Sequence, residues 1–260
     1  MSEDVTAWWR TAITDMEPGR IALRGRPIET LIGNAGFAET VWLLLRGEMP
    51  DPARARLLEA ALVAAVDHGP QAPSIAAARM AATCGVGLQS AVATGVNMLG
   101  DVHGGAGEQC AELLGRVFAA MEDGTPAEEA VPPCLEAWIA ERGPFVPGYG
   151  HRFHKPVDPR APRLMELVRE AAGAGAVSGR FAVIGEGIAD ALSAGRPVPM
   201  NIDGATAVIF CELGFPPPLA RGLFVLSRSV GILAHAWEQT CQGGRNKGPL
   251  PPSYLPLYEG

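Results

Sequence analysis

The sequence predicts a mainly α-helical protein, and three observations lead to this fold class. Alanine-rich runs dominate the apolar stretches while aromatic residues make up only 6% of the chain, and alanine favours helices whereas aromatic and β-branched residues favour strands. No run alternates apolar and polar residues convincingly, as a half-buried strand would. The 32 glycines and 23 prolines then supply the turns between helices.

The first part of the chain predicts a lead-in and two helices. The first twenty residues resemble an amphipathic lead-in segment. Apolar positions over 37–45 fit a helix that the glycine and proline of the following GEMP stretch end. A second helix is expected over 52–66, because Asp51 is a good cap and a proline follows it in the first turn.

The stretch 74–98 is rich in small residues and is apolar almost all round. Such a run is typical of a central buried helix. It ends at the glycine-rich sequence LGDVHGGAGEQC, after which a helix is expected to about residue 120. Another helix is expected over 127–142, behind the turn EDGTP.

A proline-rich loop divides this part from the rest of the chain. Segment 143–162 contains five prolines and three glycines and also concentrates charge and histidine, and chemistry often lies on such loops. After it, the stretch PVPMNIDG is expected to be extended and the last residues to form an irregular tail. The helices expected in this half span 163–172, 179–194, 205–213 and 219–241.

Charge and cysteine usage limit the partners. The net charge is −7 and no long lysine or arginine run is present, so no basic nucleic-acid surface is expected. The five cysteines include no CxxC pair, which argues against a disulfide framework or a zinc site. We see no signal-peptide core and no apolar run approaching the roughly 20 residues of a spanning helix. We therefore expect a soluble, cytoplasmic protein with no membrane partner.

Four groups that can move protons lie at glycines between expected helices. They are His68 in DHGP, His103 in VHGGA, His151 in GYGHR and Asp203 in NIDG. A lone histidine is more often structural, but histidine with carboxylate is the usual acid–base pair, since both pKa values are tunable towards neutrality. A metal at His151 and His154 is the weaker alternative, because the proline loop offers no carboxylate or cysteine at ligand spacing.

Arginines form a second group of candidates. Arg152 and Arg160 follow the loop histidine, Arg228 lies in the last expected helix and Arg245 in the tail. Arginine binds carboxylates in a bidentate manner, so several converging arginines suggest a di- or tricarboxylate ligand. Arg228 lies within the apolar run FVLSRSVGILAH and would need a partner there. No Walker A, GxSxG or GxGxxG motif is present.

Seven sequence blocks together resemble the citrate synthase superfamily. In order they are RGRPIETL, WLLLRGEMP, DHGPQAPS, LGDVHGGAGE, GYGHRFHKPVDPRAP, NIDGATAV and SRSVGILAHAWEQ, and they cover about Arg20 to Gln239. Only about 17 residues separate Pro50 from His68, where synthases carry additional helices, and DHGP and NIDG are most similar to the citryl-CoA lyase module of ATP-citrate lyase. His103 instead matches the synthase pattern LHGGA.

The resemblance implies a fold and an activity. We expect an all-α homodimer with a large helical domain over 1–109 and 206–260, and a small domain over 110–205 that closes on the substrate. The implied reaction is cleavage of citryl-CoA to acetyl-CoA and oxaloacetate. The alternatives are a citrate or 2-methylcitrate synthase and, less favoured, a non-catalytic CoA-binding partner subunit. No cofactor is expected, since the CoA thioester is substrate or product, and a separate citryl-CoA ligase would supply it.

The resemblance also implies residue roles. His151 would act at the hydroxyl or ketone oxygen, as base in cleavage and as polariser in synthesis, Asp203 would exchange the proton of the acetyl methyl carbon, and His103 would hydrogen-bond the thioester oxygen. The residues implied for substrate carboxylates are His68, Arg160, Arg228 and, across a dimer interface, Arg245. The residues implied for CoA are Val146, Pro147, Gly148, Tyr149, Gly150, Arg152 and Lys155.

Overall fold

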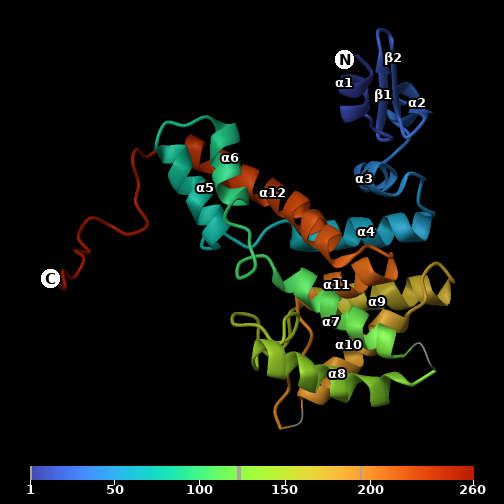
Figure 1. Ribbon diagram of the computed structural model, residues 1–260. Coiled ribbons are helices and arrows are strands. Elements are labelled where there is room, and N and C mark those ends of the chain that lie inside the picture. The colour runs from blue at the N-terminus through green and yellow to red at the C-terminus, as the bar shows by residue number, and fades with distance from the viewer. Residues whose placement is uncertain (1, 122–123, 194) are drawn as a thin grey trace. The chain divides into compact units, whose positions relative to one another are not determined.

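The computed structural model describes residues 2–121, 124–193 and 195–260, and it is mainly helical, as the sequence predicts (Figure 1). The chain divides into two compact units, the first ending at Glu59 and the second beginning at Ala60. This boundary falls inside helix α4 (Pro52–Ala65). All the candidate site residues named from the sequence therefore lie in the second unit.

The first unit contains a small sheet that the sequence analysis did not predict. Strands β1 (Thr14–Glu17), β2 (Arg20–Leu23) and β3 (Arg26–Pro27) form it in the order β1-β2-β3 with antiparallel pairing. The strands have four residues or fewer and are mostly exposed, so the sequence shows no alternation. The turn between β2 and β3 holds Arg24 at φ 49° and Gly25 at φ 78°, the positive values that a tight hairpin needs.

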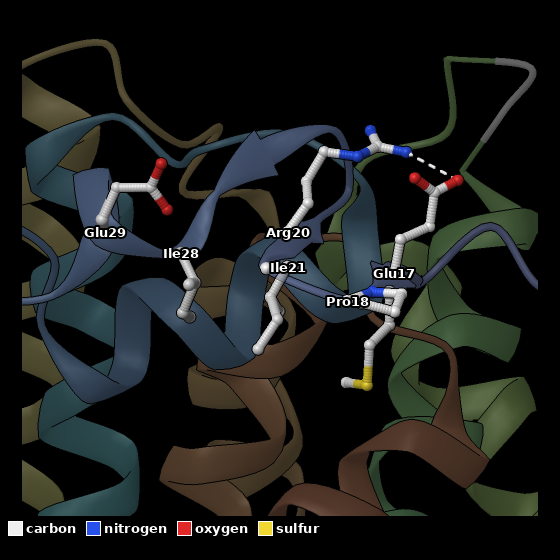
Figure 2. Close-up of a pocket in the computed structure, with 8 residues that line it drawn as sticks. Glu17, Pro18, Arg20, Ile21, Ile28 and Glu29 are labelled. Atoms are coloured by element: carbon white, nitrogen blue, oxygen red, sulfur yellow. Dashed lines mark ion pairs between the residues drawn. The ribbon is translucent and has the colours of Figure 1, made fainter.

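Three helices complete the first unit, namely α1 (Ser2–Trp8), α2 (Ile28–Leu31) and α3 (Phe37–Arg46). A pocket of about 600 Å³ opens beside the sheet. Figure 2 shows Arg20 paired with Glu17 at 3.2 Å, with Ile21 and Ile28 beside them. The pocket contains none of the residues that the sequence analysis singled out.

In the second unit, helix α12 (Pro217–Gln242) packs against α5 (Pro73–Thr83) and α6 (Leu88–Val96). The sequence analysis predicted one helix over 74–98, and this prediction is wrong. The chain turns at Gly85, where φ is 82°, but the small-residue pattern continues across the turn and hides it. The core of this group consists of Ala72, Ile75, Ala78, Ala91, Ile232 and Ala236.

The remaining helices of the second unit form another group. They are α7 (Ala106–Ala120), α8 (Ala127–Arg142), α9 (Arg160–Gly173), α10 (Arg180–Leu192) and α11 (Ile202–Glu212). Helix α7 packs against α8, α11 and α12, and α10 packs against α8, α9 and α11 (Figure 1). Helix α12 thus connects both groups. The expected division into a large domain and a closing small domain stays a prediction, because one conformation shows no closure.

Two helix starts differ from expectation in ways that affect the site. Helix α9 begins at Arg160 rather than at 163, and α11 begins at Ile202 rather than at 205. Asp203, expected in a break, therefore lies in the first turn of α11, which the Asn201 side chain caps. The predicted end of the helix over 179–194 falls on a residue outside the described ones.

Helix α12 is long and apolar enough to cross a membrane by length and composition alone, which no run in the sequence analysis suggested. One such helix is weak evidence for a membrane span. Its Ser227 and Arg228 are buried, and it packs against α5, α6 and α7. These contacts are typical of a core helix in a folded domain.

Candidate active site

The loop that carries His151 is fastened to the start of α11 through its backbone. The Gly150 N–H donates to the Pro199 carbonyl at 2.8 Å, and the Asn201 N–H donates to the Gly148 carbonyl at 2.9 Å. The Asn201 amide group also donates to the Gly150 carbonyl at 2.6 Å. These bonds fix His151, which follows directly, relative to helix α11.

Two glycines allow this close approach. A Cβ atom at Gly204 would lie 2.4 Å from the Gly148 carbonyl oxygen, and one at Gly148 would lie 2.7 Å from the Cys110 sulfur. Gly148 also has φ 89°, a conformation that glycine adopts without steric cost. A side chain at either position would separate the loop from the helix.

The segment expected to bind CoA has two different parts. Residues 146–149 are buried, and the Tyr149 hydroxyl donates to the Gly185 carbonyl at 3.0 Å. Arg152 and Lys155, by contrast, are exposed. The buried part positions the loop through bonds within the protein, while the two exposed cations are available to a ligand. Binding of CoA by either part stays a prediction.

His151 is held in one tautomer by its own loop. Its Nδ1 accepts the backbone N–H groups of Phe153 at 3.0 Å and His154 at 2.9 Å. A neutral imidazole carries its proton on the other nitrogen, so here the proton lies on Nε2. Burial lowers the pKa of His151, the charge of Asp158 raises it, and His154 and Arg160 lower it further. The net effect favours the neutral ring.

The three loop histidines of this region lie close together. The ring centre of His151 is 6.0 Å from that of His68 and 4.5 Å from that of His154. Burial lowers the pKa of His68, and the charges of Arg228 and Arg160 lower it further. His68, like His151, therefore favours the uncharged form near neutral pH.

His103 is held in the opposite tautomer. Its Nε2 accepts the Ser74 N–H at 3.2 Å and lies 2.9 Å from the Ser74 hydroxyl, so the proton lies on Nδ1. Ser74 is in the first turn of α5, and the positive end of a helix disfavours an imidazolium. Burial and the charge of Arg228 lower the pKa of His103. The ring is therefore a neutral donor through Nδ1.

Asp203 is a carboxyl group with an unusual environment. Burial raises its pKa, and the charges of Arg228 and Arg160 oppose the rise. Its backbone N–H donates to the Asn201 side chain at 2.9 Å, but no described residue hydrogen-bonds to its carboxyl oxygens. The residue keeps some exposed surface, so its carboxyl combines a raised pKa with access to a ligand.

Arg228 is buried in α12 and partly paired. Its Nε donates to the Ala65 carbonyl at 3.0 Å, and its guanidinium lies 4.9 Å from the ring centre of Phe224. Burial lowers its pKa while Asp203 raises it. Its charge also acts on His68 and His103, so Arg228 lies among the predicted catalytic groups. The Ala65 carbonyl and the Phe224 ring are the partners that a charged side chain in this apolar helix needs.

Arg160 forms a two-bond pair with Asp158. Its Nε lies 2.9 Å from Oδ1 and its Nη2 lies 2.8 Å from Oδ2, and its Nη1 reaches the Ala64 carbonyl at 3.5 Å. These contacts account for three of the five N–H donors of a guanidinium. Nη1 and Nη2 each keep one N–H that no described residue accepts, and such a pair can donate to a carboxylate of a ligand.

Of the residues implied for substrate carboxylates, Arg245 is the one that no contact among the described residues joins to the others. Its side chain is exposed, and the next two residues bond to the end of α5. The N–H of Asn246 donates to the Thr83 carbonyl at 2.8 Å and that of Lys247 to the Thr83 hydroxyl at 2.9 Å. Its contribution to a partner protomer stays a prediction.

Comparison with known proteins assigns the chain to a family. The family model described as "Citrate synthase, C-terminal domain" matches residues 48–249. The chain belongs to the citrate synthase family. It is similar to the structure of citryl-CoA lyase from Hydrogenobacter thermophilus, with 33% identity and a TM-score of 0.83, covering 97% of this chain and 94% of that one.

Several curated relatives of this citrate synthase family chain are longer enzymes. The citrate synthase of Haloferax volcanii is 31% identical over 82% of this chain and 53% of its own, and the glyoxysomal citrate synthase of Cucurbita maxima is 29% identical over 85% and 42%. The chain thus spans about half the length of the curated relatives it matches. An ATP citrate lyase from Methanothrix soehngenii, 21% identical with a TM-score of 0.81, shares the fold.

Sequence reasoning about this family member missed three residues that organise the site. Ser74 holds His103, Asn201 caps α11, and Asp158 pairs with Arg160. Asparagine before an apolar run is a recognisable cap signal, whereas Asp158 and Ser74 gave none, because their partners are distant or in an unknown conformation. Within residues 2–121, 124–193 and 195–260, no group of three or more histidine, cysteine or acidic residues is arranged to hold a metal ion.

Proposed function

We propose that this protein is a citryl-CoA lyase, which cleaves citryl-CoA to acetyl-CoA and oxaloacetate. The observation that carries the proposal is the similarity to the Hydrogenobacter thermophilus citryl-CoA lyase structure, which extends over nearly the whole of both chains. The curated citrate synthases, at comparable identity, are about twice as long. The converging neutral imidazoles, carboxyl and guanidinium groups supply the required chemistry.

Cleavage breaks the bond between the acetyl carbon and the hydroxyl-bearing carbon. The electron pair stays with the acetyl carbon as an enolate, and the hydroxyl oxygen becomes the ketone of oxaloacetate as its proton passes to Nε2 of His151. Asp203 gives a proton to the enolate carbon to form the methyl group, a role that its raised pKa supports. His103 donates from Nδ1 to the thioester oxygen, where charge develops.

His151 acts at the oxygen of the hydroxyl or ketone. With its proton on Nε2, the neutral ring polarises the ketone in the direction of condensation. To accept the hydroxyl proton at Nε2 in cleavage, the ring must first release its own proton, and the two N–H bonds to Nδ1 oppose the alternative tautomer. The hydrogen bonds therefore support the polarising role more than the base role.

The substrate carboxylates are assigned to the cationic and imidazole groups around these residues. Arg160 offers its free edge, Arg228 its buried charge and His68 a neutral ring nearby. Arg152 and Lys155 are exposed and suit the phosphates of CoA. A homodimer that shares Arg245 and a separate citryl-CoA ligase are part of the proposal and rest on the sequence resemblance alone. A cytoplasmic location is also proposed and rests on the expectation from the sequence.

A second candidate function is citrate or 2-methylcitrate synthase. His103 favours it, because this histidine in the VHGGA segment matches the synthase pattern LHGGA. Asp203 would then act as its carboxylate and remove the methyl proton. The third reading, a non-catalytic CoA-binding subunit, does not explain why the Asp203 carboxyl, which the charges of Arg228 and Arg160 affect, accepts no hydrogen bond from the described residues.

The deciding experiment gives the purified protein each substrate set separately. Citryl-CoA is offered first, and oxaloacetate release is followed through a coupled malate dehydrogenase. Oxaloacetate plus acetyl-CoA is offered next, and free thiol is followed. The lyase proposal predicts fast oxaloacetate release from citryl-CoA. Rapid net formation of citrate and free CoA would identify a synthase, and CoA binding without turnover in either assay would support the non-catalytic reading.

A further inference from the structure

Asp158 is a buried carboxylate to which the predicted roles assign no function. The residue is 1% exposed, and its two oxygens accept four hydrogen bonds. Oδ1 accepts the Arg160 N–H at 3.1 Å and the Arg160 Nε at 2.9 Å. Oδ2 accepts the Arg160 Nη2 at 2.8 Å and the Ile202 N–H at 3.2 Å. A fully bonded buried anion of this kind is rigid and costly to disturb.

Two of these bonds reach the starts of two different helices. Arg160 is the first residue of α9 and Ile202 is the first residue of α11. Free N–H groups at a helix start need acceptors, and a negative charge is favourable there. One carboxylate thus joins the start of α9 to the start of α11, across 44 residues of sequence.

We propose that Asp158 is a positioning residue, which holds the Arg160 guanidinium and the Asp203-bearing start of α11 in one fixed arrangement for the reaction proposed above, on which this inference rests. Asp203 directly follows Ile202, whose N–H bonds to Asp158. The same carboxylate occupies the Nε–Nη2 edge of Arg160 and leaves the opposite edge for a substrate carboxylate. The substrate is thereby placed in register with the group that transfers its proton.

The charge of Asp158 acts on the same groups. It raises the pKa of Asp203 and also that of His151, in each case alongside larger or opposing effects of burial and arginine charge. Removing the charge would lower both pKa values. Because a buried charge shifts these pKa values whether or not it positions its neighbours, the pH profile reports the charge of Asp158. The value of kcat and the oxaloacetate affinity report the positioning.

The test compares Asp158→Asn with Asp190→Asn. Asp190 is exposed on α10 of the same unit, so its variant removes the same formal charge without touching the helix starts. An asparagine at 158 keeps one accepting oxygen but places an NH₂ group against N–H donors. We expect D158N to reduce kcat for citryl-CoA cleavage about 10²-fold, since small misplacements of reacting groups cost this much. Oxaloacetate binding, measured by calorimetry, should weaken about tenfold or more.

The decisive readout combines the pH profile with kcat and the oxaloacetate affinity. Both limbs of the D158N profile should move to lower pH, while D190N should match the wild type within about twofold at every pH. If D158N folds, as circular dichroism reports, and keeps wild-type limbs and oxaloacetate affinity, the proposal is wrong. Should D158N not fold at the assay temperature, D158E replaces it. That variant keeps the charge but displaces it, so kcat and oxaloacetate affinity should fall while the limbs stay near their wild-type positions. Wild-type values of both would overturn the proposal.

Failure of the lyase proposal is distinguishable from failure of this one. A wild-type protein that turns over neither substrate set refutes the proposed reaction, but the pKa values of Asp203 and His151 remain measurable. Carbon-13 and imidazole NMR titrations report their pKa values without turnover. Lower pKa values for both groups in D158N, but not in D190N, would support the charge effect of Asp158. Weaker oxaloacetate binding in both D158N and D158E would support the positioning role, and unchanged values of both would reject it.

Discussion

The starts of α9 and α11 each place an aspartate deep in the second unit, yet the two carboxyl groups differ completely in their bonds. Asp158 accepts four hydrogen bonds, and the Arg160 contacts and the Ile202 N–H hold its pKa at about 2 in spite of the opposing effect of burial. Asp203 accepts none from the described residues, and burial raises its pKa. Burial acts in the same direction on both. The number of hydrogen-bond donors around each carboxyl therefore decides which one stays charged and which one becomes able to exchange a proton.

Removing the Asp203 carboxyl, which accepts no hydrogen bond from the described residues, should have the largest effect on turnover. Asp203→Asn should lower citryl-CoA cleavage by about 10²–10⁴-fold, because a positioned acid or base contributes that much. The melting temperature should change little, since no hydrogen bond from a described residue is lost. Turnover assays with thermal melts check both parts. An activity within about tenfold of wild type would show that Asp203 transfers no proton, and Glu166→Gln on the exposed face of α9 serves as control.

Overfilling the close contact between Gly204 and Gly148 at the start of α11 should lower the free energy of unfolding. Gly204→Ala places a methyl group 2.4 Å from the Gly148 carbonyl oxygen, and such overpacking typically costs about 1–3 kcal/mol or more. Gly115→Ala in α7 meets nothing within 4 Å and should stabilise the helix by up to about 1 kcal/mol. Denaturant unfolding measures both. Equal unfolding free energies in the two variants would mean that the loop and α11 are not in contact.

Acid should weaken the hydrogen-bonded pair of Asp158 and Arg160 at the start of α9. The pKa of Asp158 is about 2 in the folded protein and 3.8 ordinarily, so its contribution is complete above the ordinary value and is lost as pH falls from about 4 towards 2. The linked free energy is up to about 2 kcal/mol, and less where solvent screens the pair. Unfolding free energies of wild type and D158N across this range test it. Parallel curves would show that the carboxylate is not specially stabilised.

The smallest effect expected is in the shape of the pH profile. The raised pKa of Asp203 and the lowered pKa of His151 move towards each other. Cleavage needs a protonated Asp203 and an uncharged His151, so its rate should fall at high pH through loss of the Asp203 proton and at low pH through protonation of His151. We expect a narrow bell in kcat/KM. A flat profile through acidic and neutral pH would contradict these protonation states.

Local sequence signals predicted most of the helices but not their junctions. Asp51 and the prolines and glycines around it marked the start of α4 correctly, because caps and breakers act over a few residues. Gly85 was overlooked because both helices beside it share one composition. The sheet around Gly25 was missed because its strands are short and exposed, so burial imposed no alternation on them.

Candidate site residues could be named from the sequence, but their arrangement could not be predicted. His68, His151 and Asp203 were named from their glycine neighbours, and the resemblance supplied their roles. The fourfold bonding of Asp158 could not be foreseen, since it depends on Ile202 lying beside a residue 44 positions earlier. Tautomers were equally hidden, because they depend on which backbone N–H groups face each ring.

His151 and His103 differ in where the N–H donors that set their tautomers lie in the chain. His151 takes its donors from the next three residues of its own loop, whereas His103 takes one from a helix 29 residues earlier. A shift of the helix groups during the catalytic cycle would carry His151 and its donors together, and His103 would stay attached to α5. Each ring would then arrive at the substrate with its proton on the nitrogen that its donors set, Nε2 in His151 and Nδ1 in His103, whatever the stage of the motion.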